Sequence, residues 1–247
     1  MNFRKICLVS DNHPDPLFLE ALLQKGYSLA LHQTVSAHQA LREWLMSQDT
    51  ERVRRFETDI STLFVEFKKH YDHLNLYIKS FSPIESKPFL EITEDDFHHG
   101  NLWNWKDAFF GICEAARYFS EHPGGGAIIL IASSDQKLTR SGRVLSGTLS
   151  AALSKLTQYA GAELGQYGVC TNCVAVGKRT SDTPWELPSG TVLCTEELAS
   201  TVLFLASASS LTGNTLFLDG GESLLDEVPS RYGLAQERQS IREGEWE

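Results

Sequence analysis

The sequence predicts an α/β fold in three layers, with a doubly wound parallel sheet between two layers of helices. Strand-like and helix-like segments alternate along most of the chain. Residues 127–132 are continuously apolar, as is typical of a central parallel strand that is covered on both faces. A length of 247 residues with 42% hydrophobic residues is enough for one large core.

The first 71 residues contain six elements that alternate between strand and helix. Residues 5–10 have the pattern of a buried strand, and an amphipathic helix over 17–25 ends at Gly26. The remaining elements of this stretch are a strand over 27–32, a helix over 37–47, a strand over 54–59 and a helix over 63–71.

The rest of the chain continues the alternation. A fourth strand over 74–78 precedes an acidic loop at 91–96 and a long aromatic helix over 102–119, and Gly124 to Gly126 break the chain. Because strands and helices alternate, the crossovers are right-handed and ligands bind at the carboxyl ends of the strands. We expect one domain over 1–225 and a charged extension over 226–247. The later elements are a strand over 127–132, a helix over 147–165, a strand over 169–176, a helix over 195–206 and a strand over 215–218.

Composition excludes several classes of partner. The formal net charge is -10, with 22 Lys and Arg against 32 Asp and Glu, so no broad basic face is available for nucleic acid. No apolar run reaches the roughly 18 residues that a membrane span needs. The N-terminus leads directly into a strand rather than a signal peptide, so we expect a cytoplasmic protein without membrane contact.

The five cysteines are scattered through apolar surroundings, which favours reduced thiols over a disulfide framework. Cys170 and Cys173 have the spacing of a CxxC motif. They fall on a predicted strand, where residues three apart point to opposite faces. We therefore expect neither a redox pair nor a metal site.

The second half of the chain carries a series of short motifs in a fixed order. Together they resemble the active-site helix, the following strand and the closing turn of classical short-chain dehydrogenases/reductases, and they imply that family's Rossmann-like fold. In the first half the resemblance covers mainly the order of elements, with Asp59 and Asn104 as single-residue matches. The motifs are Ala151-Ala152-Leu153, Ala162-Glu163-Leu164-Gly165, Glu196-Glu197-Leu198-Ala199, Phe204-Leu205-Ala206-Ser207, Thr212-Gly213-Asn214 and Asp219-Gly220-Gly221.

The turn after the first strand departs from the family pattern. In the family this turn is glycine-rich and places the pyrophosphate of NAD(P) at the N-terminus of the first helix. Here residues 10–16 contain no glycine, and Asp15 before Pro16 predicts an N-cap that puts a carboxylate at the anion position. We therefore expect no cofactor, with NADP or NAD as the alternative. The family-equivalent cofactor positions are Ser10, Asp11, Asn12, His13, His32, Asp59 and Ser80.

The catalytic positions also differ. The resemblance places Ser146 where the family has its tyrosine acid and Ser150 where it has its lysine. A serine hydroxyl is a much weaker acid than a phenol, and no lysine is present to lower its pKa. Ser134, or its neighbour Ser133, matches the serine that orients the carbonyl, and Asn104 matches the asparagine of the proton relay.

We therefore expect a pseudoenzyme that has lost NAD(P)-dependent hydride transfer and binds a small molecule or a protein partner. The resemblance implies a homo-oligomer, either dimer or tetramer, formed through helices 102–119 and 147–165. One alternative is an atypical NAD(P)-dependent oxidoreductase acting on a carbonyl or alcohol, with Tyr159 or Lys155 supplying the missing groups. A third hypothesis is a cofactor-free enzyme with lyase-type or dehalogenating chemistry.

Two polar clusters have simple structural explanations. Asp11, His13 and Asp15 could form a general base or a metal-binding corner, but the surrounding prolines favour a turn with its cap. His98 and His99 follow two aspartates in what we expect to be a solvated loop.

Two further sets of residues are candidates for ligand or partner contacts. Ser133, Ser134, Ser146 and Ser150 could line one pocket, but no histidine and acid accompany them as serine hydrolysis requires. Trp185, in the short loop before the helix at 195–206, is the preferred contact for a partner or ligand.

Overall fold

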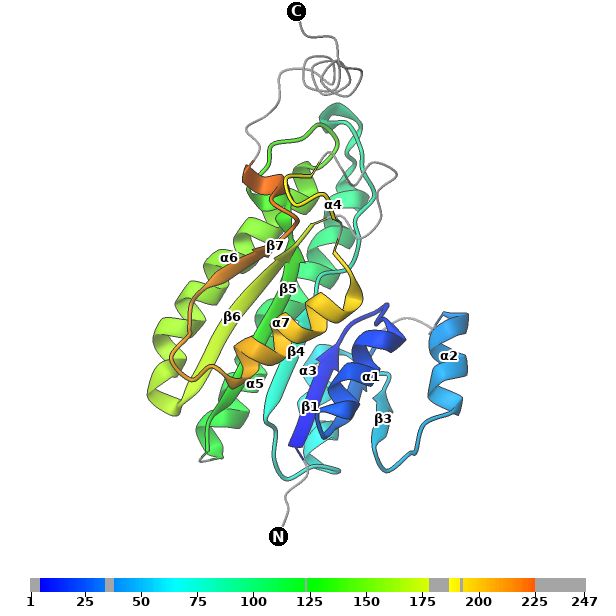
Figure 1. Cartoon of the computed structure of the whole chain (residues 1–247), viewed down its shortest axis with the longest axis vertical. Coiled ribbons are helices and arrows are strands. Elements are labelled where there is room, and N and C mark those ends of the chain that lie inside the picture. Colours follow the sequence, from blue (N-terminus) through cyan, green and yellow to red (C-terminus); the bar gives the residue numbers. More distant parts are fainter. Residues whose placement is uncertain (1–4, 34–37, 123, 178–186, 192, 225–247) are drawn as a thin grey trace, which may run out of the picture.

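A seven-stranded parallel sheet forms the centre of the protein, with strand order β3-β2-β1-β4-β5-β6-β7. The computed structural model describes residues 5–33, 38–122, 124–177, 187–191 and 193–224. Helices cover both faces of the sheet (Figure 1), which confirms the three-layer, doubly wound fold. The order of the strands reverses between β1 and β4, so the topological switch point lies between those two strands.

The first strands and helices follow the expected order with several shifted bounds: the third strand ends at Phe56 rather than Asp59, and the helix after it begins at Ile60 rather than Leu63. The fourth strand begins at Leu76 rather than Leu74, because Asn75 caps its start by accepting the N–H of Ile6 at 2.8 Å. This shift brings Lys79 and Ser80 into the strand. The elements are β1 (Lys5–Ser10), α1 (Pro16–Gln24), β2 (Tyr27–His32), α2 (Gln39–Met46), β3 (Val53–Phe56), α3 (Ile60–Lys68) and β4 (Leu76–Ser80).

The region after β4 is more helical than expected. Thr93 and Asp96 form a capping box that starts α4, so His98 and His99 lie on a helix and the expected loop there is wrong. The elements are η1 (Phe89–Glu91), α4 (Glu94–Gly100), η2 (Asn101–Lys106), α5 (Asp107–Glu121), β5 (Gly126–Ser133), η3 (Ser134–Gln136), α6 (Val144–Leu164), η4 (Gly165–Tyr167), β6 (Val169–Val176), α7 (Thr195–Ser207), β7 (Thr215–Leu218) and η6 (Glu222–Leu224).

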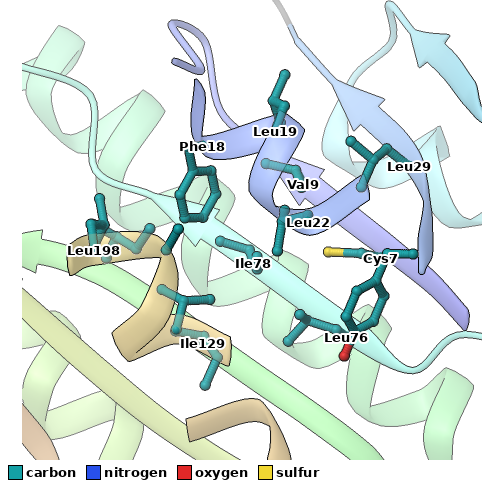
Figure 2. Close-up of a cluster of buried hydrophobic side chains, with 14 of the residues drawn as sticks. Cys7, Val9, Phe18, Leu19, Leu22, Leu29, Leu76, Ile78, Ile129 and Leu198 are labelled. Atoms are coloured by element: carbon teal, nitrogen blue, oxygen red, sulfur yellow. The ribbon is translucent and has the colours of Figure 1, made fainter. Parts of the chain in front are cut away.

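Two hydrophobic clusters fill the spaces between the sheet and its helices. On one face, α1 and α7 lie side by side and pack on the central strands (Figure 1). Figure 2 shows this cluster, in which Phe18 and Leu22 of α1 and Leu198 of α7 meet Ile78 and Ile129 of the sheet. The other face packs against α3, α5 and α6. The burial of both faces accounts for the continuous apolar runs of the central strands.

One glycine sets the distance between α5 and the sheet. A Cβ atom at Gly111 would overlap the hydroxyl group of Tyr77, which is fully buried in β4. The absence of a side chain lets α5 approach β4 closely. The N-terminal end of α5, with Asp107, is thereby held near the carboxyl end of β4.

The cysteines are free thiols, as expected. The Cys173 thiol is buried next to Ser154 Oγ at 3.9 Å, and burial raises its pKa to about 12. The Cys170 thiol instead approaches the carbonyl oxygen of Ser209, which follows α7, at 3.4 Å. The two thiols therefore point to opposite faces of β6.

Two expectations fall outside the described residues, namely the charged extension over 226–247 and the contact at Trp185. Among the helices that the structure describes, none has both the length and the apolar character that crossing a membrane requires.

Candidate active site

Buried polar side chains gather at the carboxyl edge of the sheet. Polar groups are costly to bury unless they are hydrogen-bonded, so their concentration at one edge distinguishes it from the apolar core. The edge includes the switch point, where ligands of doubly wound sheets bind. The buried residues there and on the adjoining helices are Ser10, Asn12, His32, Gln33, Lys79, Ser80, Asn104, Asp107, Ser134, Ser146 and Ser150.

The turn between β1 and α1 is closed by Asp15, as the sequence predicts. Its Oδ1 accepts the N–H of Leu17 at 2.9 Å, and Pro16 is the first residue of α1. The other oxygen, Oδ2, accepts the hydroxyl of Thr195 at 2.6 Å. Thr195 is the first residue of α7. One carboxylate thus joins the N-terminal ends of two helices.

The rest of this turn is held by local hydrogen bonds. Asp11 Oδ1 accepts the N–H of His13 at 2.8 Å, and the carbonyl oxygen of Asn12 accepts Gln33 Nε2 at 3.3 Å. These bonds support the interpretation of Asp11 and His13 as turn residues. Among the described residues, no three His, Cys, Asp or Glu side chains are placed to share a metal ion.

His32 is neutral and fixed at the end of β2. Its ring bonds the carbonyl oxygen of Thr58 and the hydroxyl of Ser10, each at 2.8 Å. Because a carbonyl oxygen only accepts, Nε2 carries the proton and Nδ1 accepts from Ser10. The pKa of His32 is lowered to about 4, mainly by burial and to a smaller extent by the charge of Lys79, while the hydrogen bond to Thr58 and the charge of Asp59 oppose the shift.

A buried lysine and a buried aspartate influence each other electrostatically near the switch point. Burial lowers the pKa of Lys79 in β4, while the charges of Asp107 and Asp11 oppose that shift. Burial raises the pKa of Asp107, and the charge of Lys79 opposes it. Each group therefore favours the charged form of the other. The sequence interpretation missed this pair, because it placed Lys79 in the turn beyond the strand.

Asn104 holds the loop that follows β4. Its Oδ1 accepts the N–H of Ser82 at 2.6 Å, and its Nδ2 donates to the carbonyl oxygen of Ser82 at 3.1 Å. Asn104 lies in η2, a π-helical stretch between α4 and α5. Such stretches are often found at functional sites. Both polar atoms of this family-equivalent residue are thus engaged with backbone.

The serines at the expected catalytic positions each have a specific partner. Ser146 Oγ donates to Asp135 Oδ2 at 2.7 Å, and Ser150 Oγ accepts the N–H of Ser133 at 3.1 Å. Ser134 is 3% exposed and lies next to Asp135 in η3. The structure therefore brings the serine set together at the junction of β5 and α6. The sequence interpretation did not identify Asp135. Its position next to Ser134 was the one signal that could have indicated it.

Tyr159 and Lys155 lie away from this junction. Tyr159 is 61% exposed, and the Lys155 ammonium group lies 5.2 Å from the centre of its ring. Lys155 also donates to Gln158 Oε1 at 2.9 Å. Tyr159 is about 13 Å further along the helix axis than Ser150, at 1.5 Å per residue. The hypothesis that Tyr159 or Lys155 supplies the missing groups stays a prediction.

The polar groups at the carboxyl edge of the sheet can be compared with those that a dinucleotide would need. The N-terminus of α1, where the family resemblance places a pyrophosphate, is filled by the Asp15 carboxylate. Two buried oxygens near the ends of β2 and β4, Gln33 Oε1 and Ser82 Oγ, have no hydrogen-bond partner within the described residues. A ribose or amide could satisfy these oxygens. These oxygens therefore fit the hydroxyl and amide groups of a nucleotide, provided that the Asp15 carboxylate turns away from the phosphate position.

Comparisons with known proteins identify related chains. A family model described as "Enoyl-(Acyl carrier protein) reductase" matches residues 20–223. The chain is 33% identical over 124 residues to a 2,3-dihydro-2,3-dihydroxybenzoate dehydrogenase of Escherichia coli (40% of this chain, 50% of that protein). It is 31% identical over 171 residues to a tropinone reductase homolog of Arabidopsis thaliana (60% and 53%). The chain thus spans about half the length of these curated relatives.

Solved structures show the same fold over nearly the whole chain. A putative oxidoreductase from Escherichia coli superposes with a TM-score of 0.80 at 21% identity, covering 90% of this chain and 99% of that one. ElxO, solved with NADP bound, superposes with a TM-score of 0.79 at 18% identity, covering 90% and 100%.

The comparisons correct two expectations. The expected loss of hydride transfer and the expected absence of a cofactor are both contradicted, because the relatives are dehydrogenases and reductases and the findings point to use of NAD or NADP. Both expectations rested on a few positions in one turn and one helix. The match over 20–223 carries more weight than those positions do.

Proposed function

The chain belongs to the short-chain dehydrogenase/reductase family, and we propose that it is an NAD(P)-dependent oxidoreductase that interconverts a carbonyl and an alcohol. The match over residues 20–223 carries this proposal. The bound nucleotide would donate or accept the hydride. The side chains of this protein would bind both ligands, exclude water between them and move the proton.

The nucleotide would bind along the carboxyl ends of β1 to β4. Asp15 must release the N–H of Leu17 before a phosphate can approach the N-terminus of α1. The unpartnered Gln33 Oε1 and Ser82 Oγ support this location. The residues that we propose for nucleotide binding are Ser10, Asp11, Asn12, His13, His32, Asp59 and Ser80.

The substrate would bind where β5 meets α6. Ser134 and Ser146 present hydroxyl groups there, and Asn104 fixes the neighbouring loop through both of its amide atoms. Ser150 supports the end of β5 by accepting the Ser133 N–H. Hydroxyl groups can orient a substrate carbonyl by donating to its oxygen.

We also propose that the protein acts in the cytoplasm as a homo-oligomer, formed through α5 and α6. Phe109 and Phe110 of α5 are 38% and 47% exposed, and Tyr159 of α6 is 61% exposed. Exposed aromatic side chains on neighbouring helices favour an interface. Light scattering coupled to size-exclusion chromatography would test this, and a monomer at micromolar concentration would contradict it.

Turnover of a substrate panel tests the proposed activity. The relatives are named for 2,3-dihydro-2,3-dihydroxybenzoate, L-rhamnose and 4-formylbenzenesulfonate, so these compounds with acetoin and benzaldehyde form a reasonable set. Each compound is incubated with NAD, NADP or their reduced forms, and the nicotinamide absorbance is followed. We expect enzyme-dependent turnover of at least one compound. Its absence across the panel would contradict the proposed activity.

A further inference from the structure

The hydrogen bond between Ser146 and Asp135 places a carboxylate beside a hydroxyl group at the end of β5. Ser146 is 6% exposed, and its Oγ donates to Asp135 Oδ2 at 2.7 Å. Asp135 itself is only half-buried, in η3. The hydroxyl is therefore enclosed, while the carboxylate retains access to solvent.

The Asp135 carboxylate supplies a proton acceptor, which a serine hydroxyl alone lacks. A lone hydroxyl would become a high-energy alkoxide if it gave up its proton, or an oxonium if it took a second one. A hydroxyl that donates to a carboxylate avoids both states, because it can receive one proton as it passes on its own. The carboxylate is the group that finally holds the proton.

Two other hydrogen bonds also connect α6 to this end of the sheet. Ser150 Oγ already accepts the N–H of Ser133, and Ser154 Oγ donates to Gln136 Oε1 at 2.5 Å. These two bonds connect the next turns of the same face of α6 to β5 and η3. Of the three, only the bond of Ser146 involves a carboxylate.

Local geometry holds the pair in place. Asp135 N–H donates to Ser133 Oγ at 3.1 Å, which fixes the start of η3. A Cβ atom at Gly147 would lie 3.0 Å from the carbonyl oxygen of Asp135, closer than nearly all such contacts. The glycine next to Ser146 therefore lets α6 approach η3 closely enough for the hydrogen bond to form.

We propose that Ser146 and Asp135 form the proton-transfer pair of this enzyme, with Ser146 as the relay and Asp135 as the proton acceptor. The proposal rests on the proposed function. In alcohol oxidation the substrate hydroxyl gives its proton to Ser146 Oγ while the Ser146 proton moves to Asp135 Oδ2. A bound NAD(P) would take the substrate C–H bonding pair as hydride, and the O–H pair would become the second bond of the carbonyl. Asp135 then releases its proton to water, and reduction reverses each step.

Three variants test the pair, using the panel compound that the wild type turns over fastest. Asp135→Asn keeps the size and an acceptor oxygen but cannot take the proton, and Ser146→Ala removes the relay. Thr148→Val is the matched control, since the Thr148 hydroxyl only bonds carbonyl oxygens of its own helix, that of Val144 at 2.6 Å. We expect kcat to fall by about 100-fold or more in the first two variants, with little change in KM or nucleotide affinity. The control should match the wild type.

Chemical rescue separates a proton-transfer role from a structural one. In Asp135→Ala, added formate can occupy the space of the missing carboxylate, and we expect it to restore part of the lost kcat. A purely structural role predicts no such recovery, and thermal melting identifies any variant that fails to fold. Wild-type kcat in Asp135→Asn, or no rescue of a folded Asp135→Ala, would overturn the pair and leave the proposed function intact. If the wild type turns over no panel compound, the proposed function fails and the pair is overturned with it.

Discussion

The carboxylate of Asp15 joins the first turns of α1 and α7, accepting the Leu17 N–H at 2.9 Å and the Thr195 hydroxyl at 2.6 Å. Asp15 and Thr195 are 180 residues apart in the chain. The positive end of α1, which binds anions in related folds, is thus occupied by a charge of the protein itself. A nucleotide phosphate must compete with that carboxylate.

Replacing the carboxylate should strengthen nucleotide binding. In Asp15→Ser the serine still caps α1 but carries no charge, so we expect the dissociation constant for NADPH or NADH to fall about fivefold, or roughly 1 kcal/mol. Thr195→Val is the control, because it removes the hydrogen bond between Asp15 and α7 and leaves the charge of Asp15. Isothermal titration of both variants measures the effect. Weaker binding by Asp15→Ser would show that the carboxylate does not oppose the phosphate.

The buried His32 should make the fold sensitive to acid. Its folded-state pKa of about 4 lies below the ordinary value of 6.5, so between these values the unfolded chain binds a proton that the folded chain does not. The resulting contribution to stability is complete above about pH 6.5 and is lost as the pH falls towards 4. It amounts to about 3 kcal/mol, at 1.36 kcal/mol per pH unit.

Urea unfolding at several pH values measures this contribution. His32→Asn should flatten the loss of stability between pH 6.5 and 4, because the asparagine does not titrate. His13→Asn on the exposed turn serves as the control for replacing a histidine by asparagine. Parallel pH profiles for the wild type and His32→Asn would contradict the assignment of a neutral buried imidazole.

The close contact between Gly111 and Tyr77 predicts a specific steric effect. The new methyl group of Gly111→Ala would overlap the Tyr77 hydroxyl, so we expect a loss of about 1–3 kcal/mol in the free energy of unfolding. Removing that hydroxyl in the double variant with Tyr77→Phe should recover part of the loss. Gly165→Ala is the control, since a Cβ atom at that position would meet nothing within 4 Å. Equal stability of Gly111→Ala and Gly165→Ala in urea would refute the contact.

The fold was predictable because its signals are local. The apolar run at 127–132 and the capped turn at Asp15 and Pro16 each identify an element without reference to the rest of the chain. The shifted start of β4 was not predictable, because it depends on the hydrogen bond of Asn75 to Ile6 in a neighbouring strand. The capping box that starts α4 is present in the sequence as Thr93 and Asp96. It predicts a helix only if Asp96 is recognised as the partner of Thr93.

The candidate site was only partly predictable. Ser134, Ser146 and Asn104 were found through the family resemblance, and the structure brings them to one edge of the sheet. The partners of these residues were not found, because Asp135 meets Ser146 only when η3 packs on α6. The expected loss of hydride transfer rested on a few replaced positions, and the family match over residues 20–223 contradicts it.

Nucleotide binding tests the central claim most directly, because it requires no knowledge of the substrate. Purified protein is titrated with NADH and NADPH while nicotinamide fluorescence and thermal stability are followed. A ligand that binds only the folded state must raise the melting temperature. The account predicts saturable binding of at least one nucleotide with a matching rise in melting temperature. No binding of either nucleotide at millimolar concentration would contradict it.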